Sequence, residues 1–501
     1  MIKSNGGIIG PDNVTTGGSF GTASGVFKLG EVTKLIRESK WPTAGPGGFQ
    51  VANSCRFNDA SSDHLTRSLG ASETSTQKGT FSFWVKRSEL STAQHIYANE
   101  VADANNRGRI LFESDGTLEI RDTVSGSSTT LYKTTQVFKD VGAWYNLVVA
   151  FDSTAGAGER ITVFKNGTRI PDAQFGTSTE PSQNANFNIF IGGQTNKNHI
   201  GKIHGGANYF DGYLAEFVYC DGQVLDADSF GEFNSQTGIW VPKDVTGLTF
   251  GNNGFYQNYS NSGALGEDFS GKDNDFTVNN LTSIDQSIDS CTNNFATLNP
   301  LIKPAAAVTL SEGNLKGVFP GSWTALPATF GLTKGKWYFE AKNITSGQNA
   351  FIGVVSENQD WDDSTPYNET TGVVLYGPGG RKTVDNTSND GFFATLSSGQ
   401  IVGVALDLDS GTKTIQFSVN GTDTPNSTPV DLPSTFDDVF IFPYFIGNSS
   451  SATANWELNF GSPPYAISSG NTDGNGFGNF EYAVPTGYLS LNTKNLAAVL
   501  A

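Results

Sequence analysis

The sequence predicts an all-β protein with more than one domain. Short runs of aromatic and β-branched residues, separated by Gly, Asn, Asp and Ser, recur along the 501 residues, a pattern typical of strands joined by turns. Glycine (59) and phenylalanine (36) are abundant, whereas methionine occurs only at Met1. A chain of this length can hold about three domains of ~150 residues, each large enough to bury a core of its own.

The charge and hydropathy of the chain argue against two classes of partner. The formal net charge is −18, and nucleic acids and anionic membranes attract basic proteins, so we expect no nucleic-acid partner. No apolar run reaches the ~18 residues that span a bilayer, so we expect no membrane insertion. The first residues lack the apolar core of a signal peptide, and the cysteines Cys55, Cys220 and Cys291 form no disulfide or metal-binding pattern, so we expect synthesis in a cytosol.

Residues 1–49 differ from the rest of the chain. Residues 1–25 are rich in Gly, Ser, Thr and Asn, which is typical of a flexible arm or of an arm ordered by a partner. In residues 26–41 apolar side chains recur near helical spacing, and Pro42 ends the pattern. We expect a short amphipathic helix there, which either anchors the chain and joins its copies or packs on its own domain.

Residues 50–240 show the alternation of short strands. Phe81, Phe83 and Val85 share one face of a predicted strand, and residues 110–120 predict a strand, a tight turn and a second strand. The phrases SFWVKRS, WYNLVVAFD, ITVFKNGTRI and YFDGYLAEF occur in this order and resemble a laminin-G-like, concanavalin A-like jelly roll. That resemblance implies two packed antiparallel sheets.

Residues 306–485 carry a second strand pattern. The phrases KGKWYFE, FIGVV and GVALDLD begin it, FIFPYF and WELNFG end it, and together they resemble a SPRY domain, a β-sandwich that binds rather than catalyses. Between the two patterns, residues 241–305 predict a connector with some strands, which stand alone or complete one of the sandwiches. Residues 486–501 predict a tail that packs back or reaches a neighbour. The predicted fold is thus all-β, with two tandem antiparallel β-sandwiches after a short N-terminal arm and helix.

The sequence offers only a weak match to a catalytic motif. Glucanases with this fold carry closely spaced carboxylates on one strand. The nearest match, residues 113–119, has one residue too many before the last glutamate, and its Asp-Gly turn sends Glu113 and Glu119 onto opposite arms of a hairpin. Neither a nucleophile elbow nor a phosphate-binding loop occurs. We therefore expect no enzymatic activity, with a polysaccharide depolymerase as the alternative.

Metal binding stays open at two places. His199 and His204 lie five positions apart in a Gly-rich stretch that predicts either a metal site or an ordinary loop. Asp103, Asp152 and Asp211 lie near predicted strand ends and have the oxygen ligands that calcium prefers. Aspartate in turns is also expected for backbone hydrogen bonding. We therefore predict no cofactor and assign no metal ligand, and calcium remains an open alternative.

The candidate ligand-binding site lies in the second sandwich. The resemblance to SPRY domains implies that ligands meet loops at one end of the sheets. The predicted loop at 358–367 offers flat aromatic faces for sugar rings or peptide side chains and carboxylates for hydroxyl groups, and the stretch near Arg381 supplies an opposite wall. Alternatively, Trp361 only closes the end of the sandwich. The predicted ligand-binding residues are Asp360, Trp361, Asp362, Asp363, Tyr367, Tyr376 and Arg381.

The arrangement as a whole resembles virion proteins of tailed bacteriophages. The phrases DSCTNNFATLNPL, GALGEDFSGKDNDFTVNN and YLSLNTKNL carry this resemblance. It implies a non-enzymatic structural protein of the virion, such as a fibre or receptor-binding protein, that recognises host cell-surface glycans. It further implies contact with other virion proteins through the N-terminal region and assembly as a homo-oligomer. The alternative within this class is a capsid-decorating or tail-architectural protein that contacts only viral proteins.

Overall fold

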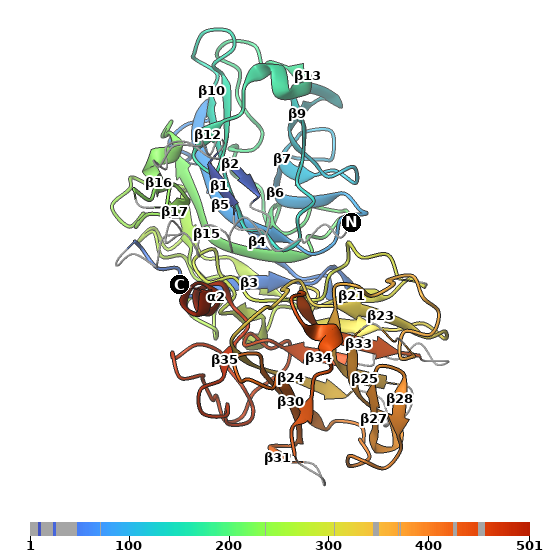
Figure 1. The fold of residues 1–501 in the computed structure, drawn as a ribbon. Helices are drawn as coiled ribbons and strands as arrows, with labels where there is room; N and C mark the ends of the chain where they lie inside the picture. The colour runs from blue at the N-terminus through green and yellow to red at the C-terminus, as the bar shows by residue number, and fades with distance from the viewer. Residues whose placement is uncertain are drawn as a thin grey trace. The chain divides into compact units, whose positions relative to one another are not determined.

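The regular secondary structure of the described residues is nearly all β-strand, as predicted (Figure 1). The computed structural model describes residues 9–11, 24–26, 48–70, 72–235, 237–304, 306–343, 350–368, 370, 372–423, 428–448 and 456–500. Within these ranges the one α-helix is α2 (Thr493–Leu500), and no helix is long and apolar enough to cross a membrane. The predicted N-terminal helix at 26–41 lies outside the described residues, apart from Val26 at the end of β2.

Two compact units divide the chain, and the boundary between their main segments falls between Thr292 and Asn293. The described residues from 48 to 292 form the first sandwich, and those from 293 to 500 form the second. The predicted connector at 241–305 is therefore divided between them. Its strands β18, β19 and β20 pair with strands of the first sandwich.

The first sandwich contains two eight-stranded sheets. Sheet I has the order β12-β11-β10-β5-β15-β3-β20, with β18 paired to β15. Its strands are β3 (Ser54–Phe57), β5 (Lys78–Arg87), β10 (Tyr145–Asp152), β11 (Ile161–Lys165), β12 (Thr168–Arg169), β15 (Gly212–Asp221), β18 (Phe255–Gln257) and β20 (Gln286–Ser287). Sheet II has the order β13-β9-β8-β7-β6-β14-β4-β19. Its strands are β4 (His64–Arg67), β6 (Gln94–Glu100), β7 (Arg107–Phe112), β8 (Thr117–Val124), β9 (Ser127–Val137), β13 (Phe175–Thr179), β14 (Asn198–Ile200) and β19 (Thr277–Asn279). Two small sheets, β1 (Ile9–Pro11) with β2 (Ser24–Val26) and β16 (Gly231–Phe233) with β17 (Trp240–Pro242), complete this part of the chain.

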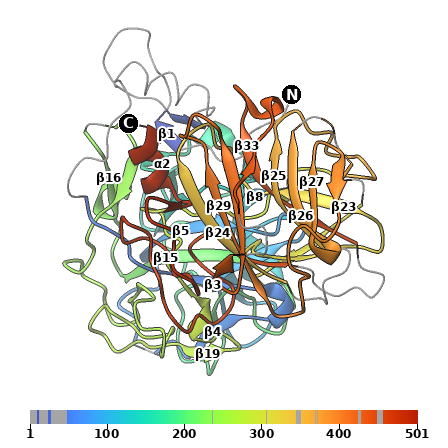
Figure 2. The ribbon, with the colours of Figure 1, turned by 60° about the horizontal axis from the view of Figure 1, so that its bottom comes forward.

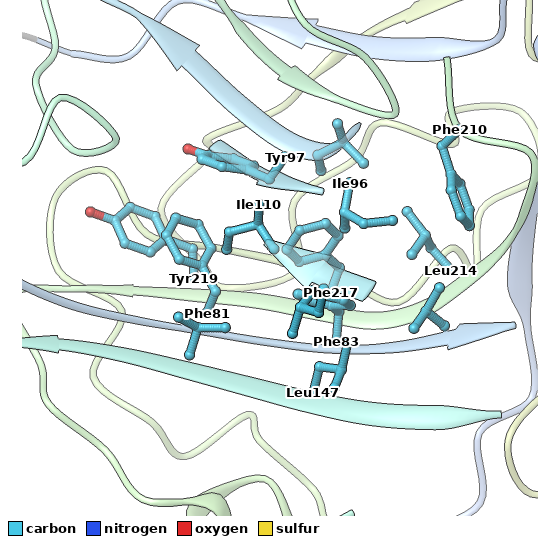
Figure 3. Packing of buried hydrophobic residues seen from close by; sticks show 14 of the residues in the cluster. Phe81, Phe83, Ile96, Tyr97, Ile110, Leu147, Phe210, Leu214, Phe217 and Tyr219 are labelled. Carbon is cyan, nitrogen blue, oxygen red and sulfur yellow. The ribbon is translucent and has the colours of Figure 1, made fainter. Parts of the chain in front are cut away.

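Aromatic side chains fill the space between sheets I and II. Phe81, Phe83 and Val85 point inward from β5, as their alternation predicts, and are fully buried. The ring of Phe81 stacks on that of Tyr219 from β15, with the centroids 4.5 Å apart, and lies 4.5 Å from the ring of Tyr97 on β6 (Figure 3). Side chains from the two sheets therefore share one core.

The outer face of sheet I is buried as well. Trp84 and Trp144 point away from the core between the sheets, and belong to a separate apolar cluster with Trp240 and Tyr256. The chain that follows β15 thus covers the strands that precede it. This second layer explains why β5, β10 and β15 are buried on both faces, although strict alternation predicts one exposed face.

The beginning and the end of the first sandwich lie side by side. Cys55 on β3 is paired with Gln286 on β20. Slightly further out, the backbone N–H of Val51 donates to Thr292 Oγ1 at 3.1 Å, and the Thr292 hydroxyl donates to the Val51 carbonyl at 3.0 Å. These contacts close the first sandwich on itself.

The second sandwich packs a nine-stranded sheet III on a six-stranded sheet IV. Sheet III has the order β21-β22-β34-β24-β29-β30-β31, with β32 paired to β30 and β35 paired to β24. Its strands are β21 (Thr309–Ser311), β22 (Lys316–Val318), β24 (Lys336–Asn343), β29 (Ile401–Asp407), β30 (Thr414–Val419), β31 (Thr422–Asp423), β32 (Val430–Asp431), β34 (Trp456–Asn459) and β35 (Leu489–Ser490). Sheet IV has the order β23-β33-β25-β26-β27-β28. Its strands β33, β25 and β26 can be followed in Figure 2. Its strands are β23 (Thr324–Pro327), β25 (Ala350–Ser356), β26 (Val373–Gly377), β27 (Arg381–Val384), β28 (Thr387–Asn389) and β33 (Ile441–Gly447).

The core of the second sandwich includes the C-terminal residues. Trp337, Phe339 and Trp456 are fully buried between sheets III and IV. The strand β35 pairs in parallel with β24, and Leu496 and Val499 of α2 pack against the same core. The predicted tail at 486–501 thus packs back onto its own sandwich over its described residues.

Candidate functional site

The predicted aromatic loop lies over the outer face of sheet IV. It joins β25 to β26, and Trp361 within it meets Phe442 and Tyr444 of β33 with ring centroids 6.2 Å away in each case. Tyr367 stacks on Phe351 of β25 at 5.5 Å, with the two rings nearly parallel. Both aromatic side chains are partly buried in this cluster. The rings predicted to receive a ligand therefore cover the sheet.

The aspartates of the same loop are more accessible. Asp360 and Asp362 are exposed, and the hydrogen bond that Asp362 shares with Asp360 raises the pKa of the Asp362 carboxyl. The Asp363 carboxylate accepts a hydrogen bond from the backbone N–H of Thr365 at 3.0 Å. The loop thus retains hydrogen-bond acceptors at its surface.

Tyr376 and Arg381 do not form the opposite wall of that loop. Tyr376 is fully buried, and its hydroxyl donates to the carbonyl of Ala394. Arg381 begins β27, at the end of sheet IV where β26 finishes, whereas the loop enters β26 at its other end. The Arg381 Nε atom donates to Asp390 Oδ1 at 2.6 Å. The structure therefore separates these two residues from the aromatic loop.

A pocket of about 690 Å³ opens at one edge of the second sandwich. Lys382 and Val384 on β27 are in register with Tyr376 and Val374 on β26. Those two β26 side chains point into the core, so Lys382 and Val384 point toward the same inner side of sheet IV. At this edge the inner face of sheet IV no longer covers the core and instead forms one wall of the pocket.

The opposite wall comes from the segment that contains β32. Val430 of this strand still belongs to the core, while its neighbour Asp431 is exposed. Strand β32 pairs with β30 of sheet III, so the pocket lies between the edges of the two sheets. The residues that line it are Lys382, Val384, Asp385, Thr387, Asn389, Phe392, Thr428, Pro429, Val430, Asp431 and Pro433.

The pocket combines apolar surfaces with groups that can donate or accept hydrogen bonds. Lys382 Nζ lies 3.8 Å from the centroid of the Phe392 ring, a cation–π contact. The Asp385 carboxylate is already engaged, since it accepts hydrogen bonds from the backbone N–H groups of Gly372 and Val373 at 2.9 and 3.0 Å. Lys382, Asn389 and Asp431 remain as polar groups that a ligand could meet. The volume lies within the range of small-ligand sites, ~300–1,000 Å³.

Sequence reasoning missed this pocket, although a signal was present. The inner-face positions of β26 are apolar, whereas Lys382, Thr387 and Asn389 occupy the corresponding face of the next hairpin. A polar side chain on the inner face of a sandwich needs either a partner or solvent. The change from apolar to polar inner positions therefore marks where the interior opens.

The glutamate pair considered for catalysis lies on a hairpin, as predicted. Glu113 and Glu119 lie on the two arms that meet at the Asp115-Gly116 turn, and the N–H of Gly116 donates to the Glu113 carbonyl at 2.8 Å. Glu119 is held by Arg121, with Nε to Oε1 at 2.7 Å and Nη2 to Oε2 at 2.8 Å. Burial raises the pKa of Glu119, and the arginine opposes that shift. Both oxygens of Glu119 thus lie against the Arg121 guanidinium, one of them in a hydrogen bond.

The histidines of the Gly-rich stretch hydrogen-bond within the protein. The His199 and His204 rings approach at 3.3 Å between Nε2 and Nδ1, and His199 Nδ1 lies 3.0 Å from Thr66 Oγ1. Burial, followed by the nearby Lys202, lowers the pKa of His199 to about 3. Among the residues that the structure describes, no group of three or more His, Cys, Asp or Glu side chains is arranged to hold a metal ion.

Each of the three aspartates considered for calcium contacts a different set of residues. Asp103 accepts hydrogen bonds from Asn105 and Asn106 in a turn. Asp152 forms an ion pair with Lys78 at 3.3 Å. Asp211 is fully buried, and burial, followed by the adjacent Asp59, raises its pKa well above the ordinary value.

One family model matches part of the first sandwich. Residues 59–228 match the sequence model of a family described as the Concanavalin A-like lectin/glucanases superfamily. This match supports the predicted laminin-G-like, concanavalin A-like character of that sandwich. No curated protein matches the chain.

Several solved structures are similar to this chain. The SPRY domain of human HERC1 is 20% identical, with 32% of this chain and 96% of that chain covered and a TM-score of 0.25. Domains LG4-5 of the mouse laminin alpha1 chain are 12% identical, with 83% and 92% covered and a TM-score of 0.30. A putative carbohydrate binding protein from Bacteroides ovatus is 13% identical, with 46% and 61% covered and a TM-score of 0.30.

Proposed function

We propose that this protein binds glycans and acts in attachment rather than in catalysis. The observation that carries the proposal is the pocket at the edge of the second sandwich. Its Phe392 and proline surfaces suit the apolar face of a sugar ring, and Lys382, Asn389 and Asp431 suit the ring hydroxyl groups. The match of the first sandwich to a family that includes lectins supports the same class of ligand.

The proposed setting is the virion of a tailed phage. The protein would be a fibre or receptor-binding protein that contacts other virion proteins through its N-terminal residues and recognises glycans on the host cell. The support is the resemblance of three sequence phrases to such proteins. Assembly as a homo-oligomer would strengthen weak sites through effective concentration, without any new contact.

The test is binding of the purified full-length chain to a panel of immobilised oligosaccharides and to extracted envelope polysaccharide. We expect Lys382→Ala and Asn389→Ala each to weaken binding by about tenfold, because each removes one polar contact from a partly enclosed site. The matched control is Lys334→Ala, which removes an exposed lysine of the same sandwich outside the pocket.

Two results would overturn the proposal. One is the absence of glycan binding at micromolar protein with the fold intact, which would leave the capsid-decorating or tail-architectural alternative. The other is release of reducing sugar from a bound polysaccharide, which would favour the depolymerase. Equal binding by Lys382→Ala and Lys334→Ala would show that the glycan site lies outside this pocket.

A further inference from the structure

Three arginines crowd the outer face of sheet II in the first sandwich. Ile110 and Phe112 of β7 point into the core, so Arg107 and Arg109 on the same strand point outward. Arg121 on β8 lies directly opposite Arg109 in the register of the two strands. Two like charges in directly opposed positions destabilise a sheet.

Two of these arginines lack a partner. Arg121 pairs with Glu119, but neither Arg107 nor Arg109 forms an ion pair or a side-chain hydrogen bond with any residue that the structure describes. The Nε atoms of both are buried without a hydrogen-bond partner. Burial, followed by Arg107 and Arg121, lowers the pKa of Arg109 to about 10. Both arginines are otherwise partly exposed, so an anion from solvent can reach them in a chain whose 49 acidic residues outnumber its 31 basic ones.

A buried histidine lies next to the arginines. His95 on β6 lies in register with Leu111 of β7, on the same outer face. It is only 5% exposed, and its ring nitrogens form no hydrogen bond of standard geometry among the described residues, although the backbone of Asn208 lies near enough to favour the charged ring. Burial, followed by Arg109, lowers its pKa to about 3, so the ring is neutral and offers one N–H donor.

The acidic groups nearest to this face form no ion pair with Arg107 or Arg109 among the described residues, although the charges of Glu119 and Glu113 favour the charged form of Arg109. Glu100 lies opposite Arg107 across β6 and β7, but it forms its ion pair with Lys197 at 3.0 Å. Asp115 at the tip of the hairpin pairs with Lys133 at 2.8 Å. Neither Glu100 nor Asp115 therefore forms an ion pair with Arg107 or Arg109, and both arginines can still contact an external anion.

We propose that Arg107, Arg109, Arg121 and His95, named here the arginine face, bind the carboxylate or sulfate group of an acidic sugar. The planar guanidinium fork matches both anions in a bidentate manner. Arg107 and Arg109 are both partly exposed, so a small anionic group can contact their guanidinium groups from solvent. This inference rests on the proposed glycan-binding function and specifies its ligand class.

The test uses the full chain and four probes: polygalacturonate, dextran sulfate, neutral dextran and an acidic peptide. The variant Arg107→Gln/Arg109→Gln removes the two unpaired charges. The control Arg169→Gln/Lys243→Gln removes the same charge from exposed pairs, whose basic side chains are 39% and 38% exposed. We expect the first variant to lose at least about tenfold in affinity for one or both acidic polymers, and the control to lose less than about twofold. The polymer with the larger loss identifies carboxylate or sulfate as the bound group.

A thermal-unfolding measurement separates this inference from the proposed function. The first variant should be at least as stable as the parent without ligand, because it removes repulsion. Free glucuronate or sulfate should raise the Tm of the parent and not of that variant. If neutral glycans bind and the acidic polymers bind no more tightly, the arginine face is not a binding site, although the glycan-binding function stands.

The remaining outcomes also support or overturn the inference. If no polysaccharide binds, but an anion raises the Tm only when Arg107 and Arg109 are present, the anion site stands and the glycan-binding function fails. Equal losses of affinity in the two double variants would show that net charge alone causes the effect, and would overturn the inference. Binding of the acidic peptide, without binding of acidic sugars, would overturn it in favour of a protein partner.

Discussion

Lys86 and Asp289 form an ion pair that is almost completely buried on the outer face of sheet I. Lys86 Nζ lies 2.7 Å from Asp289 Oδ2, and the two side chains are 1% and 2% exposed. The other oxygen of Asp289 accepts a hydrogen bond from Trp144 Nε1 at 3.1 Å. The pair therefore fastens the segment after β20 to strands that precede it by more than a hundred residues.

Removing one member of this pair should be costly. Asp289→Ala leaves the ammonium of Lys86 buried without its counter-ion, and we expect the free energy of unfolding to fall by about 3–5 kcal/mol in urea titrations. The control is Glu232→Ala, which breaks the exposed Lys243–Glu232 pair at 3.6 Å and should cost about 0–1 kcal/mol. Similar losses from the two variants would show that the buried pair stabilises no more than a surface one.

The stability of the first sandwich should depend on the protonation of Asp122. Burial raises the pKa of this carboxyl to about 7. The native state therefore keeps its proton to near neutral pH, whereas the unfolded chain loses it near pH 4. The contribution of Asp122 to stability is thus largest at low pH and falls as the pH rises from about 4 to about 7, by up to about 4 kcal/mol at ~1.4 kcal/mol per pKa unit.

Asp122→Asn tests this dependence. The amide imitates the neutral acid and keeps an oxygen for the N–H of Ile189, which donates to Asp122 Oδ2 at 3.3 Å. Urea titrations between pH 4.5 and 8 should show a flatter profile for the variant than for the parent. Asp244→Asn, at an exposed carboxyl whose pKa is lowered by its hydrogen bonds with Thr246, should leave this decline in place. An unchanged decline in Asp122→Asn would contradict the assignment.

Gly353 should tolerate no side chain. A Cβ atom at this position of β25 would lie 1.9 Å from the backbone oxygen of Val374 on the adjacent strand, which cannot move without disrupting sheet IV. We expect Gly353→Ala to lower stability by about 1–3 kcal/mol, measured by thermal and urea unfolding. Gly411→Ala is the control, because nothing lies within 4 Å of its Cβ position, and it should be neutral or stabilise by up to about 1 kcal/mol. Equal effects of the two substitutions would refute this packing argument.

Trp361 should contribute to stability through its packing on sheet IV. Trp361→Ala should reduce the free energy of unfolding by about 2 kcal/mol, less than a fully buried tryptophan would cost. The indole N–H is buried without a hydrogen-bond partner among the described residues, so Trp361→Phe should retain most of the stability. The expectation that Trp361→Ala weakens glycan binding stays a prediction. Glycan binding by the stable Trp361→Phe variant separates a ligand contact from a loss of folding.

The positions of the strands, and the side of the sheet to which their side chains point, could be predicted because both depend on residues that are close in the sequence. Phe81, Phe83 and Val85 alternate along one strand, and the turn between Glu113 and Glu119 is encoded by the residues within it. The same alternation places Trp84 on the opposite face. It cannot reveal that Trp240 covers that face, because the contact joins residues that are more than 150 positions apart.

The candidate site was harder to predict for a related reason. An aromatic loop such as the one around Trp361 and Tyr367 has the same composition whether it meets a ligand or its own sheet. Only the tertiary contact of Tyr367 with Phe351 shows that the sheet is covered. The pocket near Lys382 depends in turn on residues of two segments, around β27 and around β32, that meet only in the folded chain, which no local pattern specifies.

The hydrogen bonds between Val51 and Thr292 place the two ends of the first sandwich next to each other. This arrangement affects how the sandwich can be joined to other proteins. A domain whose entry and exit points coincide can be cut out, duplicated or inserted into a surface loop of an unrelated host through a single junction, since it leaves the two host ends adjacent. Recombination can therefore transfer this module between carriers at little structural cost to donor or recipient.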